Sequence, residues 1–476
     1  MLKATTVFIA PIALSLTGCA GMAGVAPHDH PRPVQDLEAA ATMAPASVVK
    51  DSWPGEHWWR EFSDPQLDRL EDEALADSPT LEIAQARLEQ AVAAAATVRS
   101  SLAPHVEADA SGTRERFSEH DVFPQPLAGS TRTESRLALD IGYELDFWGK
   151  NRASLAAALD RAEAARVDAF AARLLLSTAV AHTYVELARL YDRLDIAKET
   201  LAQRQRIYDL TRQRVAAGLD TRVELRQAEA ELPATREQIA TLREALAVAR
   251  HRLAALLGQG PDRGLTIERP KLAMQTSEMS LPSRVPADLL GRRPDVAASR
   301  QRVRAAEQDI KVARAQFYPN INLLAFVGFQ SINLSQLLDA GSHTAGVGPA
   351  LRLPVFEGGR LRGQLAGASA DYDLAVAQYN SVLIEALHEL ADRLAAFQSV
   401  ATQSGEQRLA MAAAQDAYDL SVMRYRTGVG SYLSVLSAET QVLKQKNLEA
   451  DLRARTHANH IDLIRALGGG FTGVQP

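Results

Sequence analysis

The sequence predicts a mainly α protein with a transmembrane β-barrel segment, and three observations support this fold class. The chain is a tandem duplication, so that each predicted element occurs twice. Two very long segments almost lack the residues that end helices, which predicts long antiparallel helices. Four segments of about ten residues alternate apolar and polar side chains, as the strands of a membrane barrel do.

The duplication is visible as residues that recur in the same order at a nearly constant offset. Ser78-Pro79-Thr80-Leu81 is matched 215 positions later by Arg293-Pro294-Asp295-Val296, and Tyr208-Asp209-Leu210 is matched 210 positions later by Tyr418-Asp419-Leu420. The offset changes only between elements, as insertions and deletions in connecting loops would produce. Each half is therefore predicted to contain a helix, two strands around a loop, a long helix, a sharp turn and a final helix.

The N-terminus carries the only cysteine of the chain. The apolar run from Val7 to Leu16 is too short for an ordinary transmembrane helix and is typical of a signal-peptide core. It ends in Leu16-Thr17-Gly18-Cys19, which resembles a bacterial lipobox. We therefore expect cleavage after residue 18, so that residues 1–18 are a signal peptide, and a diacylglyceryl group on Cys19. No other cofactor is predicted.

Residues 19–50 are predicted to be a flexible acylated tether, because they are rich in Pro, Ala and Gly. By resemblance to sorted bacterial lipoproteins, Ala20 favours the outer membrane over the inner one. His28 and His30 lie in this tether, where histidines are more often linker than ligand, so no metal site is predicted.

The helical segments follow from the positions of Gly and Pro. None occurs between Ala153 and Ala217, and the counterpart from Ala368 to Thr427 contains only Gly405. Helices from Asp220 to Leu257 and from Ser431 to Leu467 follow the turns, and Pro233 predicts a kink or a break in the first of them. The predicted domains are a first repeat at 51–259, a linker at 260–290, a second repeat at 291–470 and a tail at 471–476.

The strand alternation is clearest from Arg136 to Phe147. Leu137, Leu139 and Ile141 point to one side, and Asp140, Glu144 and Asp146 point to the other. Strands are also predicted at His105–Arg114, near 320–330, where Leu324 and Phe326 interrupt the alternation, and near Gly346–Phe356. Four strands are too few to enclose a barrel, and lipid does not tolerate unpaired strand edges. The chain must therefore oligomerise.

Composition and missing motifs exclude several function classes. A net charge of −6 argues against nucleic-acid binding, and one cysteine excludes a disulfide framework or an all-thiolate metal site. The sequence has no GxSxG, HExxH or GxxxxGK[ST] motif. We therefore predict that the protein is not an enzyme and does not itself supply energy for transport.

Several motifs together resemble the outer membrane factor family, in its lipoprotein branch of drug-efflux channels. They are the lipobox at Cys19, Tyr143-Glu-Leu-Asp-Phe-Trp-Gly-Lys-Asn-Arg152, Arg292-Arg-Pro-Asp295, Phe317-Tyr-Pro-Asn320, Phe356-Glu-Gly-Gly-Arg360 and Ala466-Leu-Gly-Gly-Gly-Phe471. The resemblance implies a homotrimer in the outer membrane, in which four strands per chain complete a twelve-stranded barrel above a periplasmic α-barrel. It also implies passive export of small toxic compounds, coupled through a periplasmic adaptor to an inner-membrane pump. An overall similarity to fusaric-acid and aromatic-acid resistance channels implies that aromatic acids are the exported compounds.

The same resemblance assigns the candidate site residues. The turns Val215–Thr221 and Tyr425–Ser431 match the family's periplasmic tips, with Gly218, Leu219, Thr221, Gly428, Val429 and Ser431 facing the adaptor. Leu433 matches a constriction position. Relatives carry an acid where this chain has Ser437, and Glu439 lies two residues on, so these three residues form the predicted gate. Asp140, Glu144 and Asp146 are predicted to face the lumen and to favour cations.

Two alternative functions remain open at this point. A channel for type I protein secretion would share the fold, although the lipobox and the Arg292–Asp295 and Ala466–Gly470 motifs favour drug efflux. A structural lipoprotein with a long coiled coil would have no pore, and apolar stripes on helices alone do not exclude it.

Overall fold

The computed structural model describes residues 22, 24–33, 36–37, 53–122, 124–273 and 291–473. The predicted signal peptide and Cys19 lie outside these residues. The described residues form two compact units. The first comprises those of Met1–Pro31, Arg87–Ala165 and Ala298–Asn380, and the second those of Arg32–Ala86, Arg166–Ala297 and Ser381–Pro476. Among the helices that the structure describes, none is both long and apolar enough to cross a membrane.

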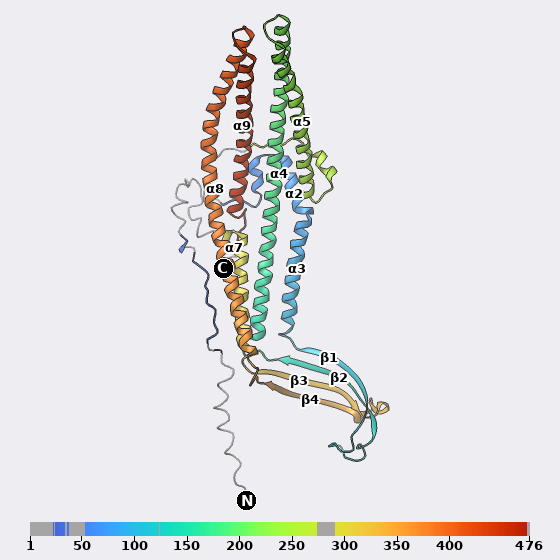
Figure 1. Cartoon of the computed structure of the whole chain (residues 1–476). Coiled ribbons are helices and arrows are strands. Elements are labelled where there is room, and N and C mark those ends of the chain that lie inside the picture. Colours follow the sequence, from blue (N-terminus) through green and yellow to red (C-terminus); the bar gives the residue numbers. More distant parts are fainter. Residues whose placement is uncertain are drawn as a thin grey trace. The chain divides into compact units, whose positions relative to one another are not determined.

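The two repeats contain the same elements in the same order (Figure 1). The first repeat consists of α3 (Pro79–Ser100), β1 (His105–Arg116), β2 (Thr131–Glu144), α4 (Lys150–Ala216) and α5 (Arg222–Leu256). The second consists of α7 (Pro294–Ala315), β3 (Asn320–Ser331), β4 (His343–Arg352), α8 (Arg360–Arg426) and α9 (Tyr432–Ala466). Matching helices have equal lengths, with 22 residues in α3 and α7, 67 in α4 and α8, and 35 in α5 and α9. The predicted order of elements is confirmed.

Short helices stand outside the repeated elements. The 3₁₀ helix η3 (Trp58–Phe62) and helix α2 (Pro65–Asp77) precede the first repeat, and η4 (Pro261–Thr266) follows α5. Two further 3₁₀ turns, η5 (Leu334–Gln336) and η6 (Ala340–Ser342), lie in the loop between β3 and β4.

The first unit contains one antiparallel sheet in the order β1-β2-β3-β4. Its register places Val106, Ile141, Ala325 and Val347 side by side across all four strands. The rows on either side of them on this face are also largely apolar, and large side chains such as Val347 are 76 % exposed. One face of the sheet is therefore a continuous apolar surface, as the predicted alternation requires.

The opposite face is polar but includes Leu324 and Phe326, which interrupt the alternation in the sequence. Phe326 lies next to Gly346 in the register. A Cβ atom at Gly346 would lie 2.6 Å from Cε1 of Phe326, so the aromatic ring covers the glycine of the neighbouring strand. The Phe326 side chain thus fills the space beside Gly346 on the polar face. Strand β3 therefore accommodates this apolar residue without a change in which of its side chains face each side of the sheet.

Two strand ends differ from the prediction. Strand β4 covers His343–Arg352 and not Gly346–Phe356, because β3 begins at Asn320, which pairs with Arg352, and leaves later residues without a partner. Pro354 also lacks the N–H group that a strand would need. Strand β2 ends at Glu144, so the prediction that Asp146 lies on this strand is wrong.

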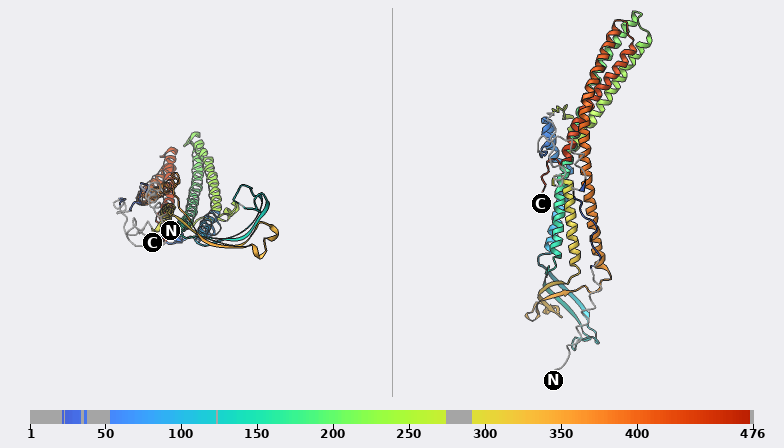
Figure 2. Two further views of the ribbon diagram at one scale, coloured as in Figure 1. Left: turned by 90° about the horizontal axis from the view of Figure 1, so that it is seen from below. Right: turned by 90° about the vertical axis from the view of Figure 1, so that its left-hand side faces the viewer.

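The second unit contains two antiparallel helix pairs: the part of α4 from Arg166 onward with α5, and the part of α8 from Ser381 onward with α9 (Figures 1 and 2). Its largest core cluster joins Trp58, Trp59 and Phe62 of η3 to buried residues of α2, α4 and α5. Asp64 accepts a hydrogen bond from the Gln66 backbone N–H at 2.9 Å and one from the Tyr184 hydroxyl at 2.7 Å. The N-cap of α2 is thereby tied to the middle of α4.

The predicted break at Pro233 is wrong, because α5 continues through it from Arg222 to Leu256. Proline removes one backbone donor, and the carbonyl group that loses its partner belongs to Glu229, four residues earlier. Both residues are exposed, so water can bind this carbonyl oxygen. The helix therefore tolerates a proline that a buried helix would not.

Candidate functional site: helix tips and strand charges

The two predicted turns connect α4 to α5 and α8 to α9, and they have the same backbone geometry. Gly218 and Gly428 adopt φ angles of +74° and +84°, which L side chains rarely adopt. The Leu219 N–H donates to the Arg214 carbonyl at 2.9 Å, and the Val429 N–H donates to the Arg424 carbonyl at 3.0 Å. Each long helix thus ends in a Schellman-type motif with glycine in the left-handed position.

The helices that follow begin at the predicted polar residues. Thr221 caps α5 in a capping box with Glu224, whose carboxylate accepts the Thr221 N–H at 2.9 Å. The Ser431 hydroxyl accepts the Ser434 N–H at 3.3 Å at the start of α9. Between glycine and cap, each turn presents one apolar side chain to the outside: Leu219 is 62 % exposed and Val429 69 %.

A polar cluster that the sequence did not predict joins the two turns. The Arg214 guanidinium is only 9 % exposed and pairs with Asp220 of its own turn, at 2.7 Å from Nε to Oδ2. It also donates to the Tyr425 backbone carbonyl at 2.8 Å and lies 4.5 Å from the centre of the Tyr425 ring. The Tyr425 hydroxyl in turn donates to Asp220 at 2.6 Å. We refer to Arg214, Asp220 and Tyr425 as the tip cluster.

The tip cluster exists on one side of the duplication only. Arg214 recurs as Arg424, but the positions equivalent to Asp220 and Tyr425 are Gly430 and Val215. Asp220 and Tyr425 thus differ from their equivalents in the other repeat. This difference between the repeats is the feature of the sequence that could have indicated the cluster.

The environment fixes the charge of the tip cluster. The hydrogen bond from Arg214 lowers the pKa of Asp220, and the Tyr425 hydroxyl lowers it further, against the opposing effect of burial. Burial together with the neighbouring Asp220 raises the pKa of Tyr425 to about 12. At neutral pH the cluster therefore consists of a guanidinium, a carboxylate and a neutral phenol.

The three predicted gate residues do not share a face of α9. Leu433 is 67 % exposed, and Ser437, one turn on, is exposed beside it. Glu439 is buried and pairs with Arg204 of α4 at 3.1 Å, and Arg204 also pairs with Glu231 of α5 at 2.6 Å. The assignment of Glu439 to the gate surface is therefore wrong, because its carboxylate connects helices inside the second unit.

Each of the three predicted lumen acids has a basic residue as an ion-pair partner. Arg136 pairs with Asp140 at 2.6 Å and with Asp109 of β1 at 2.9 Å, and Lys150 pairs with Glu144 at 2.5 Å. Asp146 accepts the backbone N–H groups of Asn151 and Arg152 at 3.1 and 2.9 Å, at the start of α4. The structure thus assigns Asp146 a helix-capping contact and leaves Asp109, Arg136 and Asp140 as a group with one net negative charge.

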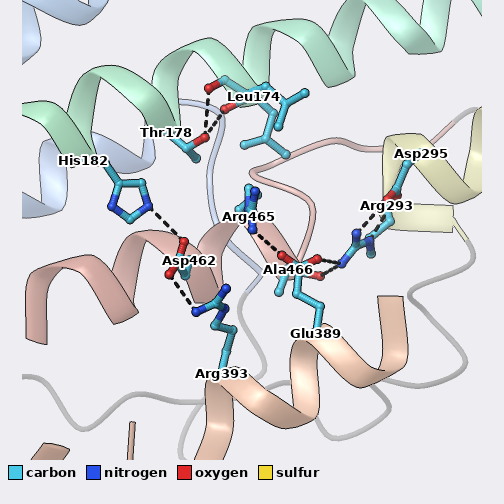
Figure 3. A network of polar contacts seen from close by, with 11 residues as sticks. Leu174, Thr178, His182, Arg293, Asp295, Glu389, Arg393, Asp462, Arg465 and Ala466 are labelled. Carbon is cyan, nitrogen blue, oxygen red and sulfur yellow. Dashed lines mark hydrogen bonds and ion pairs between the residues drawn. The ribbon is translucent and has the colours of Figure 1, made fainter. Parts of the chain in front are cut away.

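Two of the sequence motifs, Arg292–Asp295 and Ala466–Phe471, contact each other in the second unit (Figure 3). Arg293 is 8 % exposed, pairs with Asp295 at 2.6 Å and with Glu389 of α8 at 2.8 Å, and donates to the Ala466 carbonyl at 3.3 Å. Nearby, Asp462 of α9 joins His182 of α4 at 2.9 Å to Arg393 of α8 at 3.0 Å. These contacts hold α4, α8 and α9 together within the second unit.

The three glycines after α9 allow a close approach of backbones. A Cβ atom on Gly468 would lie 1.9 Å from the Arg292 carbonyl oxygen, and one on Gly470 would lie 2.5 Å from the Gly55 carbonyl carbon. All three glycines have positive φ angles. The Ala466–Phe471 motif is therefore required by packing.

Comparison with known proteins agrees with this architecture. The profile described as outer membrane efflux protein matches residues 70–259 and 285–469. The fusaric acid resistance protein FusA of Burkholderia cepacia is 41 % identical over 371 residues, which are 77 % of this chain and 69 % of that protein. The multidrug resistance outer membrane protein MdtP of Escherichia coli is 30 % identical over 465 residues, 96 % of this chain and 94 % of that one.

A solved structure has the same fold. The crystal structure of the outer membrane protein VceC from Vibrio cholerae superimposes with a TM-score of 0.84 at 38 % identity, and covers 88 % of this chain and 100 % of that one. The predicted fold class is confirmed: long helices and four strands per chain, as in the trimeric outer-membrane channels. These relatives are channels and not enzymes. The chain is an efflux exit duct of the outer membrane and belongs to the outer membrane efflux protein family.

Proposed function

We propose that three copies of this chain, each anchored by a lipid on Cys19, conduct small toxic compounds from a periplasmic adaptor to the exterior. An inner-membrane pump supplies the energy, because the sequence contains no phosphate-binding loop for nucleotide hydrolysis. The adaptor binds the six helix tips of the trimer. The observation that carries this proposal is the pair of matching turns, each with one exposed apolar side chain on a rigid backbone.

The tips are suited to binding another protein. Leu219 and Val429 stand at equivalent places in the two turns, so a trimer presents six similar apolar contacts. The left-handed glycines and the capped helices on both sides hold each contact in place, which lowers the entropy lost on binding. An adaptor with six equivalent binding surfaces would therefore contact one similar apolar side chain at each of the six tips.

The test replaces both apolar contacts by acids. The double variant Leu219→Asp with Val429→Asp is expected to lose resistance and adaptor cross-linking at least tenfold, while the trimer still forms. The control is Leu265→Asp in η4, where the leucine is 70 % exposed, comparable to the two tip residues. Wild-type resistance in the double variant would contradict adaptor binding at the tips.

We further propose that the constriction is formed by Leu433 with Ser437 and that Glu439 takes no direct part in it. Leu433→Ser is expected to raise the conductance of purified trimers in planar bilayers severalfold. Leu448→Ser, at another partly exposed leucine of the same helix, serves as control. Equal conductance in both variants would exclude Leu433 from the constriction.

For cargo, we propose aromatic carboxylic acids. The name of the relative that is 41 % identical, a fusaric acid resistance protein, supports this choice. Deletion of the gene is expected to lower the inhibitory concentration of fusaric acid at least fourfold and to leave that of large hydrophobic antibiotics unchanged. The opposite pattern would favour a broad multidrug role, as in the name of MdtP.

A further inference from the structure

The described residues just after Cys19 pack against the helices of the first unit. Val25 and Pro27 are half-buried, whereas Gly24, Ala26 and His28 are exposed. From Val25 onward this alternation indicates an extended chain with one side turned toward the protein. A turn precedes it, in which Gly24 has a φ angle of +80° and the Val25 N–H donates to the Met22 carbonyl at 3.4 Å. We refer to residues 24–29 as the strap, which lies beside α8 in Figure 1.

One carboxylate of α8 binds two consecutive backbone N–H groups of the strap. The His28 N–H donates to Oδ1 and Oδ2 of Asp373 at 3.0 and 3.2 Å, and the Asp29 N–H donates to Oδ1 at 3.0 Å. Hydrogen bonds to a charged acceptor are the stronger kind. Because both donors belong to the backbone, Asp373 recognises the path of the chain and not the side chains of the strap.

The strap also has an apolar contact on the same two helices. Val25 packs with Met22 against a cluster at the end of α7 and the start of α8, formed by Ile310, Ala313, Phe317, Leu361 and Leu365. This cluster adjoins the first residues of β3 and the last residues before α8, where the sheet meets the helices.

The spacing of the two contacts fits an extended chain that runs along a helix. From Val25 to Asp29 such a chain advances about 12 Å at 3.1 Å per residue. From Leu365 to Asp373, α8 advances about 12 Å at 1.5 Å per residue. Pro27 and Pro31 restrict the backbone and disfavour helix at the preceding residues, so the strap loses less entropy on packing than a glycine-rich tether would.

We infer that Asp373 is the clamp that fixes the N-terminal strap on α7 and α8, and that the lipid anchor is thereby held at one place beside the sheet. Met22, which packs on the apolar cluster, comes three residues after Cys19 in the sequence. The consequence for the lipid rests on the proposed lipidation of Cys19, whereas the clamp itself does not. The chain thus carries its anchor on a docked strap and not on a free tether.

The test is a nitroxide label at Ala26→Cys, an exposed strap position, in trimers purified from the membrane. With native Asp373 the spectrum is expected to be that of an immobilised label. Asp373→Ala is expected to raise the ratio of mobile to immobile label about tenfold, as the loss of charged hydrogen bonds predicts. The matched control is Asp371→Ala, which removes the same charge from an exposed position two residues away on α8.

The outcomes separate the clamp from the lipid. A label that is mobile with native Asp373, or equal spectra for the Asp373 and Asp371 variants in intact trimers, would overturn the inference. In a chain with an ordinary cleaved signal peptide and Cys19→Ala, the label is expected to stay immobile although the lipid is lost. If the mass of the native N-terminal peptide shows no lipid while the label stays immobile, lipidation fails and the clamp stands.

Discussion

At the scale of single residues, Arg214 connects the two repeats at their tips. It gives two N–H groups to Asp220 and one to the Tyr425 carbonyl, a geometry that lysine cannot reproduce. Arg214→Lys is expected to lose about 1.5–3 kcal/mol of local stability. Amide exchange at Gly218, Leu219 and Val429 should therefore become at least about tenfold faster by mass spectrometry. The same substitution at the exposed equivalent, Arg424→Lys, should leave these rates unchanged; similar rates in the two variants would contradict the role of Arg214.

The pH dependence of the tips follows from Asp220. Its pKa is lower in the folded protein, chiefly through Arg214, so its ionised form stabilises the fold. This contribution is complete above the ordinary aspartate pKa and is lost as the pH falls through the lowered value. Exchange rates at the tips, corrected for intrinsic rates, should be constant from pH 8 to pH 5 and rise only below about pH 4. Asp220→Asn should abolish the rise, and a transition near pH 6 would show that another group controls the tips.

The gate residues show what could be read from residue spacing. Leu433 and Ser437 are four positions apart, so a helix places them on one face, as the structure does. Glu439 is six positions from Leu433, which turns it toward the opposite side of the helix. The contact with Arg204 could not be predicted, because that arginine lies more than 200 residues earlier on another helix.

At the scale of elements, most helix ends were predictable and several strand ends were not. Helix α4 lies between glycines with positive φ angles, and α8 ends at one. Helix α8 begins at Arg360, eight residues before the predicted Ala368, because Gly363 and Gly367 lie inside the helix. Strand β4 ends where β3 stops offering a partner, which depends on pairing between segments and not on local composition. The same reasoning explains why Asp146 alternates with its neighbours in sequence but lies beyond the strand.

Pro233 provides a test of helix α5. Pro233→Ala restores the N–H donor to the Glu229 carbonyl in a continuous exposed helix, so it should stabilise the trimer by about 1–3 kcal/mol. The expected result is a higher denaturation midpoint in detergent. The reciprocal variant Leu443→Pro, at the equivalent position of α9, should lower it. A lower midpoint for Pro233→Ala would mean that the tip needs a proline-induced bend.

At the scale of the whole molecule, the sheet is the part that one chain cannot complete. Among the described residues, β1 and β4 each pair with one strand only, so both outer edges are open. The alternation and the number of strands predict oligomerisation, because lipid does not accept such edges. The number of copies came from the family resemblance, since no residue of a single chain specifies three.

The two faces of the sheet give the final prediction. Val347 and Thr344 lie on the same edge strand but on opposite faces, the first on the apolar surface and the second on the polar one. An arginine on the lipid side of a barrel costs about 2–4 kcal/mol near the membrane centre, whereas a lumen position tolerates it. Val347→Arg should therefore reduce the heat-modifiable trimer in outer-membrane fractions at least tenfold, and Thr344→Arg should leave its amount near that of the parent. If both variants assemble equally well, the apolar face of the sheet does not face lipid.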